Sequence, residues 1–381
     1  MKKLLFISPR NPFSGRFSGD VIRAKKFIGF FEKKYKTTVI TIDKVNSNKK
    51  IGKVKIISFK DKNFIFKLIK VIFSLLNLKP LQLGYFYSKE LNDYILQNYK
   101  NFDIIFCQSV RAAQYVTNLE FKKKVLDMGD LYSNNYYQTF KMKSWFNPMK
   151  IIFFIESILM KNYEKLCFDN FFKILLFSRR EIKSVKAVKK NKIIQINFGI
   201  DEIINKFRFN KNNNKIIFIG NMKYLPNKIA CTNFIKNTLP KLLKVNSNIQ
   251  FHIIGEISKL NKFLWEKNKS IQTHGKVKNL KPLLANTICG LANLNISSGI
   301  QTKLLSYMSY GIPSISSNQV IKNFDAIKSN SLPAYRNEKE LIKLILRLKN
   351  KKTYSLSISK KSLNLIRKFK WKNVLKDLNK I

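Results

Sequence analysis

The sequence predicts an α/β protein made of two doubly wound units. Three observations support this fold class: the chain has 381 residues, short apolar runs recur along it, and helical segments separate these runs. A chain of this length suggests two domains and allows three, and its 45% hydrophobic residues can bury a sizeable core in each. We therefore expect two parallel sheets with helices between their strands.

The expected strands form two series. The first series comprises residues 3–8, 38–42, 54–59, 103–109, 124–128, 174–178 and 193–199, and the second comprises 215–221, 249–255, 271–276, 288–294 and 312–317. A polar run without periodicity at 210–215 indicates a domain boundary nearby. We place the N-terminal domain at 1–204, the C-terminal domain at 205–365 and a last helix at 366–381. This helix is expected to pack back across the domain junction, because Trp371, Val374, Leu375 and Leu378 share one face.

The net charge of +51 has two explanations. Such an excess attracts polyanions, which favours a nucleic acid or an anionic membrane as partner. However, Lys, Asn, Ile and Phe have codons made of A and T alone, so an AT-biased genome would produce much of this composition. The lysines are also spread along the whole chain, as on a solvated surface. We predict no specific nucleic-acid partner and keep an anionic membrane surface as a candidate.

Cysteine and histidine usage gives no sign of a metal site or of disulfides. The four cysteines are far apart and lack CxxC spacing, so they are expected to be buried free thiols in a reducing compartment. The only histidines are His252, inside an expected strand, and His274. A histidine-built metal site is therefore not expected. Separately, we predict no bound cofactor.

The apolar stretches are too short to span a membrane. The run before Ser8 is shorter than the core of a signal peptide, and charged residues interrupt the stretches at 64–78 and 151–160. A cytoplasmic protein is expected. Residues 62–79 form an amphipathic helix with Lys67 and Lys70 on a narrow stripe. Its apolar face can either pack on the N-terminal sheet or lie in a membrane interface.

Two loops that follow strands have residues suited to an anionic ligand. In the first loop, Gly15 and Gly19 allow close approach of the backbone, and Asp20 can cap the helix that follows. In the second, Gly220 ends a strand, and Lys223 lies just before a helix start. Each loop can equally be an ordinary surface connection.

A third loop, at 297–316, raises a more specific question. Ser297 or Ser298 can cap a helix that runs to Tyr310, and Lys303 falls in its first turn. A lysine there is unfavourable beside the positive end of the helix dipole, unless a phosphate binds at that end. One face of this helix, including Ser306, is either turned toward a ligand or exposed to solvent.

Several motifs occur in the order known from one enzyme family. They lie at 84–91, 103–116, 124–136, 196–201, 218–227, 274–284 and 298–317. The ordered set resembles bacterial glycosyltransferases of family 4, in the branch associated with capsule and exopolysaccharide sugar transfer. The resemblance covers nearly the whole chain.

This resemblance implies a GT-B fold, in which two Rossmann-like domains face each other across a cleft. It implies a metal-independent retaining hexosyltransferase that moves a sugar from a nucleotide diphosphate sugar to a glycan or lipid-linked glycan acceptor. Donor contacts would come from Gly220, Asn221, Lys223, Gly299, Ile300, Gln301 and Lys303, with Ser306 toward the ribose. Gly19, Asp20 and Gln108 would line the cleft from the other side. The enzyme would be cytoplasmic or peripheral on the inner face of the cytoplasmic membrane, and no nucleophile is expected.

The sequence departs from the family pattern at four positions. Two glutamates common in the family are Ser298 and Ser306 here, an arginine is Asn221, and a histidine is replaced around Gln108. These departures leave a second interpretation open: a non-catalytic GT-B protein that acts as a binding or assembly partner in the same pathway.

Overall fold

The computed structural model describes residues 1–15, 18–185, 190–295, 301–324 and 332–381. The chain divides into two compact units, one formed by Met1–Asn197 with Val374–Ile381 and the other by Phe198–Asn373. We call these unit 1 and unit 2. The divisions thus lie after residues 197 and 373, whereas the sequence places its boundaries after 204 and 365.

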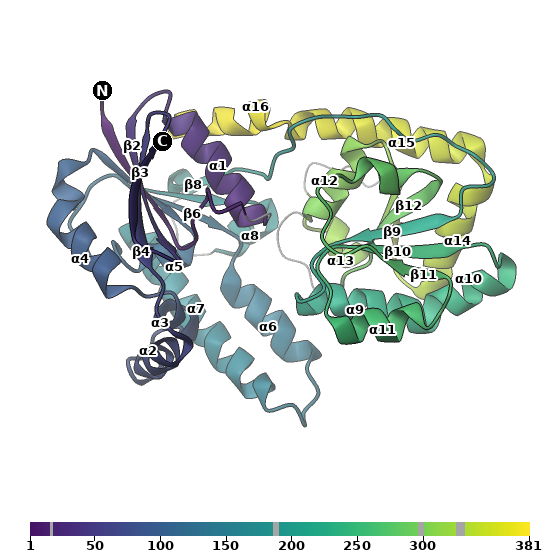
Figure 1. The fold of residues 1–381 in the computed structure, drawn as a ribbon, viewed down its shortest axis with the longest axis horizontal. Coiled ribbons are helices and arrows are strands. Elements are labelled where there is room, and N and C mark those ends of the chain that lie inside the picture. The colour runs from purple at the N-terminus through teal and green to yellow at the C-terminus, as the bar shows by residue number, and fades with distance from the viewer. Residues whose placement is uncertain (16–17, 186–189, 296–300, 325–331) are drawn as a thin grey trace. The chain divides into compact units, whose positions relative to one another are not determined.

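Unit 1 is built around a sheet that has eight strands within the described residues, in the order β3-β4-β2-β1-β5-β6-β7-β8 (Figure 1). All neighbours pair in parallel except β3 with β4. The strands are β1 Lys3–Ser8, β2 Lys36–Asp43, β3 Ser47–Ile51, β4 Val54–Lys60, β5 Ile104–Gln108, β6 Lys124–Gly129, β7 Lys173–Leu176 and β8 Ile193–Gln195. Its helices are α1 Gly19–Phe31, α2 Phe64–Leu76, α3 Leu81–Tyr85, α4 Lys89–Asn98, α5 Val110–Ala113, α6 Tyr132–Met142, α7 Met149–Asn170 and α8 Arg179–Ser184.

Alternating side chains of the unit 1 sheet form two cores. On one face, Phe6 and Phe106 stack with ring centroids 5.1 Å apart, and Phe27 and Phe31 of α1 pack against Phe106. Residues of the other face, such as Leu5, join a cluster with side chains of α4, α5 and α7. Because both faces are covered, these strands are continuous apolar runs in the sequence.

Unit 2 has a six-stranded parallel sheet within its described residues, in the order β11-β10-β9-β12-β13-β14. Its strands are β9 Lys215–Ile219, β10 Gln250–Ile254, β11 Ile271–Thr273, β12 Thr287–Ala292, β13 Ser314–Ser317 and β14 Ala334–Tyr335. The helices are α9 Leu225–Asn233, α10 Leu239–Val245, α11 Lys259–Glu266, α12 Thr302–Ser309, α13 Asn318–Ile321, α14 Glu338–Asn350 and α15 Lys352–Ile366, and the short α16, Trp371–Val374, contains the division after residue 373. In Figure 1, α9, α10 and α11 run along one side of this sheet.

The α/β class and both strand series are confirmed, since each of the expected strands is present. Two strands were not predicted, because β3 is polar and exposed and β14 has only two residues. The segment expected as one last helix is instead broken into short pieces. Lys370 adopts extended backbone there, where Ile200 donates to the Phe369 carbonyl at 2.8 Å and Trp371 donates to the Ile200 carbonyl at 2.9 Å.

No helix within the described residues is both long and apolar enough to cross a membrane. All four cysteines are buried and free, as expected.

Candidate functional site

The loops after β9 and β10 approach each other so closely that two glycines are required. A Cβ added to Gly255, whose φ is +135°, would lie 1.8 Å from the Gly220 carbonyl oxygen. A Cβ on Gly220 would lie 2.7 Å from the side-chain nitrogen of Asn227. Gly220 therefore brings the end of β9 next to α9, at the carboxyl edge of the unit 2 sheet where ligands of parallel sheets bind.

Asn221 and Lys223 belong to one exposed hydrogen-bonded turn. The Asn221 side-chain oxygen accepts from the Lys223 backbone N–H at 2.8 Å, and its amide donates to Glu256 at 3.2 Å. The Lys223 ammonium forms an ion pair with Glu256 at 2.7 Å and lowers the pKa of that carboxyl. Because both partners are exposed, this pair is easily exchanged for another anion.

Lys303 lies in a different environment from the one its position suggests. It is the second residue of α12 and only 5% exposed. Its ammonium donates to the Asn227 side-chain oxygen at 2.7 Å and lies 3.8 Å from the centroid of the Phe218 ring. Burial lowers the pKa of Lys303 to about 7. A solvent-exposed position is thereby excluded for this lysine.

Asn227 joins the two parts of the site. Its side-chain nitrogen donates to the Asn221 carbonyl at 2.9 Å, while its oxygen accepts from Lys303. One buried amide, 7% exposed, thus connects the loop after β9 to the start of α12. The sequence motifs did not indicate Asn227, although an asparagine inside a short helix that follows a glycine turn is a usable signal.

The position of α12 is fixed by Tyr307. Its hydroxyl accepts from the Ile219 N–H at 2.8 Å and donates to the Leu291 carbonyl at 3.1 Å, so it ties α12 to the ends of β9 and β12. Gly290 makes room for the ring, because a Cβ there would lie 2.4 Å from it. Ser306 is half-buried one position earlier, and its hydroxyl donates to the Thr302 carbonyl at 3.2 Å. Gln301 lies directly before the helix, whereas the predicted contacts Gly299 and Ile300 lie outside the described residues.

In unit 1 the structure brings the three cleft candidates together. Gly19 and Asp20 begin α1, and the buried Gln108 side chain donates to the Asp20 carbonyl at 2.5 Å. The Gln108 side-chain oxygen accepts from the Ser8 hydroxyl at 2.7 Å, so both of its polar groups are used within the protein. Arg10 forms an exposed ion pair with the Asp20 carboxylate at 2.9 Å.

Unit 1 also contains buried ionisable groups that the sequence did not indicate. Arg23 makes two hydrogen bonds to Asp127, at 2.7 and 2.8 Å, with both side chains 3% exposed. Glu181 accepts from the Leu131 N–H at 3.2 Å. Burial, together with the charge of Asp130, raises the pKa of Glu181 to about 9. The aspartate within the apolar run of β6 was a usable signal for the first of these groups.

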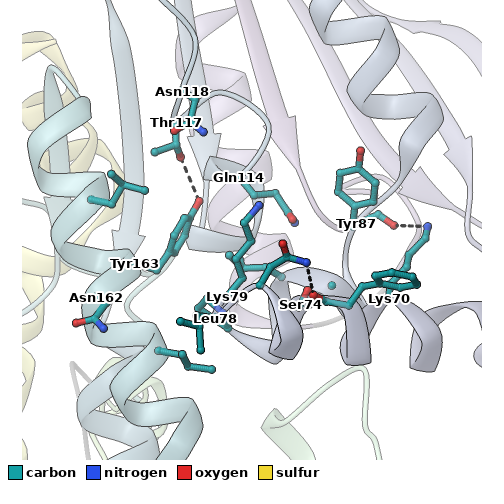
Figure 2. Close-up of a pocket in the computed structure, with 17 residues that line it drawn as sticks. Lys70, Ser74, Leu78, Lys79, Tyr87, Gln114, Thr117, Asn118, Asn162 and Tyr163 are labelled. Carbon is teal, nitrogen blue, oxygen red and sulfur yellow. Dashed lines mark hydrogen bonds between the residues drawn. The ribbon is translucent and has the colours of Figure 1, made fainter.

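A separate cavity of about 610 Å³ lies between α2, α3 and α7 of unit 1. Figure 2 shows its polar groups, including Tyr163, which shares a hydrogen bond of 3.1 Å with Thr117, and Lys70, which donates to the Tyr87 carbonyl at 3.1 Å. The apolar lining comes from Phe73, Leu78, Pro80, Leu83, Leu159 and Leu166. No sequence motif indicated this cavity.

The described residues contain no group of histidine, cysteine and carboxylate side chains that could hold a metal ion. His252 and His274 instead contact each other, with ring nitrogens 2.9 Å apart. Burial, with the charge of His274 adding to it, lowers the pKa of His252 to about 4.

Part of unit 2 is similar to a known protein family. Residues 213–351, which lie within unit 2, match the family model described as glycosyl transferases group 1. This match includes Gly220, Asn227 and Lys303. No curated protein sequence matches the chain.

The fold of the whole chain is similar to that of solved GT-B structures. Sucrose-phosphate synthase from Thermosynechococcus elongatus superposes with a TM-score of 0.71 at 10% identity, covering 100% of this chain and 98% of the other. HepE from Anabaena, in complex with UDP and glucose, gives 0.68 at 10% identity with the same coverage. An E. coli trehalose-6-phosphate structure bound with UDP-2-fluoro glucose gives 0.69 at 12% identity and covers 99% and 98%. These likenesses confirm the predicted GT-B fold class.

Proposed function

We propose that the protein is a metal-independent retaining glycosyltransferase of family 4. It moves a hexose from a nucleotide diphosphate sugar to a growing, lipid-linked surface glycan of the capsule or exopolysaccharide type. The observation that carries the proposal is the group 1 domain at 213–351, with the Gly220 turn, Asn227 and Lys303 joined at the carboxyl edge of its sheet.

The donor diphosphate would lie between the loop after β9 and the start of α12. We assign Gly220, Asn221, Lys223, Gly299, Ile300, Gln301 and Lys303 to contacts with the diphosphate and sugar, and Ser306 to the ribose. In the reaction, the bond between the anomeric carbon and the phosphate oxygen breaks. The acceptor oxygen bonds to the same face of the sugar, and the departing phosphate takes the acceptor proton. Lysine charge and helix N–H groups stabilise the diphosphate that leaves.

Lys303 supports this assignment in a specific way. With its pKa near 7, the lysine is only partly protonated at neutral pH, because burial disfavours its charge. A bound diphosphate supplies the missing opposite charge, so donor binding is expected to raise this pKa and take up a proton. Calorimetry of donor binding in buffers of different ionisation enthalpy measures that proton.

The acceptor would bind unit 1, with Gly19, Asp20 and Gln108 beside the transferred sugar. The cavity between α2 and α7 is the described feature of unit 1 best suited to the apolar part of a lipid-linked acceptor, since six of its lining residues are apolar. Such an acceptor places the enzyme at the inner face of the cytoplasmic membrane, where an anionic membrane surface is its second partner.

The proposal is tested by incubating the purified protein with a panel of nucleotide diphosphate sugars and lipid-linked acceptors. Release of nucleotide diphosphate, and a product whose anomeric configuration matches that of the donor by NMR, are expected. The replacement of a common glutamate by Ser306 favours one rival, a non-catalytic GT-B protein that assembles with other enzymes. Donor binding without turnover over the whole acceptor panel would establish that rival.

A further inference from the structure

The polarity of helix α2 is the reverse of that of an ordinary surface helix. All of α2 lies within the described range 18–185, and none of its residues is buried. Its least exposed positions are Lys67, Lys70, Val71 and Ser74, which form a stripe at helical spacing. The most exposed side chains are apolar: Phe64, Ile65, Ile72, Phe73 and Leu76 are 59–73% exposed. Packing of the apolar face on the sheet, one of the two expectations for this segment, is thus wrong.

Polar contacts hold the inward stripe of α2 in place. Lys67 forms an ion pair with Asp61 at 2.6 Å, and Lys70 donates to the Tyr87 carbonyl. Gly84 of α3 lies so close that a Cβ there would be 2.3 Å from the Lys70 carbonyl oxygen. The helix is therefore fixed with its lysines turned toward the protein and its apolar face turned outward.

The turn between α6 and α7 shows the same reversal. Trp145 and Phe146 are 84% and 98% exposed, whereas Lys150 is only 8% exposed, with its ammonium 3.8 Å from the centroid of the Trp145 ring. Farther along α7, Ile151, Ile152, Phe154 and Ile158 are exposed. Figure 1 shows α2 and this turn on the same side of the unit 1 sheet.

Helix α3 connects α7 to α2. Glu156 of α7 accepts from the backbone N–H groups of Leu81 and Gln82 in α3, which packs against α2. Side chains of α2 and α7 also line the same cavity (Figure 2). We call the exposed apolar residues of α2, of the α6–α7 turn and of α7 the apolar surface of unit 1.

We propose that the apolar surface of unit 1 binds an anionic lipid bilayer, with α2 lying in the interface and Trp145 and Phe146 inserted beside it. Exposed apolar patches of this extent mark interaction sites, and an aromatic pair at a turn suits the boundary between headgroups and acyl chains. Charge complementarity selects the bilayer over a second copy of this basic chain, because exposed lysines lie on the same segments: Lys79 just after α2, Lys141 in α6, and Lys161 and Lys165 in α7. The proposal deepens the proposed function, because it names the surface that contacts the membrane. It rests on the proposed function only in taking the acceptor to be lipid-linked.

The test uses the full chain and vesicles of phosphatidylcholine, alone or mixed with phosphatidylglycerol. Sedimentation is expected with the anionic vesicles and should weaken as salt rises. The triple change Ile65→Gln, Ile72→Gln and Leu76→Gln, and the double change Trp145→Gln and Phe146→Gln, should each reduce partitioning at least about tenfold, since each lost apolar side chain is worth about a factor of ten when buried. The control variant carries Leu260→Gln and Phe263→Gln on α11 of unit 2. These two side chains are 65% and 64% exposed, and their replacement should leave vesicle binding unchanged.

Tryptophan fluorescence locates the contact directly. The chain has three tryptophans, of which Trp265 and Trp371 are 8% and 5% exposed, so Trp145 at 84% is the one open to solvent. Anionic vesicles should shift its emission to the blue, and brominated lipids should quench it, while Trp145→Phe should lose both signals and still sediment.

Unchanged binding of both apolar variants, or no binding at low salt, would overturn the proposal. A dimer in light scattering that both variants abolish would instead make a second copy the occupant. Donor hydrolysis by the same variants reports on the proposed function separately, because the changed residues lie outside unit 2.

Discussion

The change Lys303→Met tests whether the buried lysine carries an energetic cost that a bound phosphate would relieve. Methionine keeps the length and apolar stem of the side chain but removes the ammonium that contacts Asn227 and Phe218. We expect the variant to stay folded and to lose donor turnover by about a hundredfold, which is the usual cost of removing one preorganised electrostatic contact. Its stability should also depend on pH differently from that of the wild type.

The size of that difference follows from the pKa of Lys303. Between pH 7 and 10 the unfolded chain, in which the group titrates near its ordinary 10.5, binds more protons than the folded protein, where the pKa is about 7. Stability therefore rises with pH in this window. The lysine lowers the free energy of unfolding by about 4 kcal/mol at pH 7 but by only about 1 kcal/mol at pH 10, so the wild type should gain about 3 kcal/mol relative to Lys303→Met. The variant also loses the hydrogen bond to Asn227. This loss changes the free energy of unfolding by the same amount at every pH, because an amide does not titrate.

Urea unfolding of unit 2 can be followed by itself. In a Trp145→Phe background, the remaining tryptophans, Trp265 and Trp371, both lie in unit 2. The unfolding free energy of wild type and Lys303→Met is measured at pH 7, 8, 9 and 10, with the exposed Lys343→Met on α14 as the matched control. A difference that does not change with pH would refute the lowered pKa, and unchanged kinetics would remove Lys303 from the donor site.

Three further predictions concern other parts of the molecule. Ser306→Glu should tighten nucleotide binding in calorimetry, because a carboxylate accepts from ribose hydroxyls more strongly than a hydroxyl does; weaker binding would show that Ser306 does not face the ribose. Leu166→Trp, at the cavity between α2 and α7, should raise KM for a lipid-linked acceptor and leave donor hydrolysis unchanged; an unchanged KM would place the acceptor elsewhere. Glu181→Gln should raise the unfolding temperature, and by more at pH 9 than at pH 5. The pKa of Glu181 is raised to about 9, so the wild-type folded state loses stability as pH rises through this window. A difference in unfolding temperature between variant and wild type that stays constant with pH would contradict that pKa.

The parallel strands could be predicted from the sequence because burial on both faces requires apolar side chains at successive positions. Each central strand, such as β5, is an apolar run bounded by polar or small residues, so periodicity is not needed to find it. Strand β3 is not an apolar run, because it lies at the edge of the sheet with exposed lysines. Its pairing depends on β4 rather than on its own composition.

Neither the burial of Lys303 nor the network of Asn227 could be predicted in the same way. The sequence places a lysine at the start of a helix, and the dipole argument shows that the position is unusual. It does not show which side chains surround the ammonium, since Phe218 and Asn227 come from segments about 80 residues away along the chain. Local patterns identified the residue, whereas its environment depends on how β9, α9 and α12 meet.

Helix α2 shows why amphipathicity alone cannot assign a helix to a core. The spacing of Lys67 and Lys70 separates a polar stripe from an apolar face, and either can be turned inward. The ion pair of Lys67 with Asp61 and the close approach of Gly84 decide that the polar stripe faces the protein. Lys303 and the lysines of α2 are thus alike in being turned inward, yet Lys303 lies at a candidate anion site, while those of α2 leave an apolar face exposed. The net charge of +51 distinguishes neither case, because what each lysine does depends on its contacts.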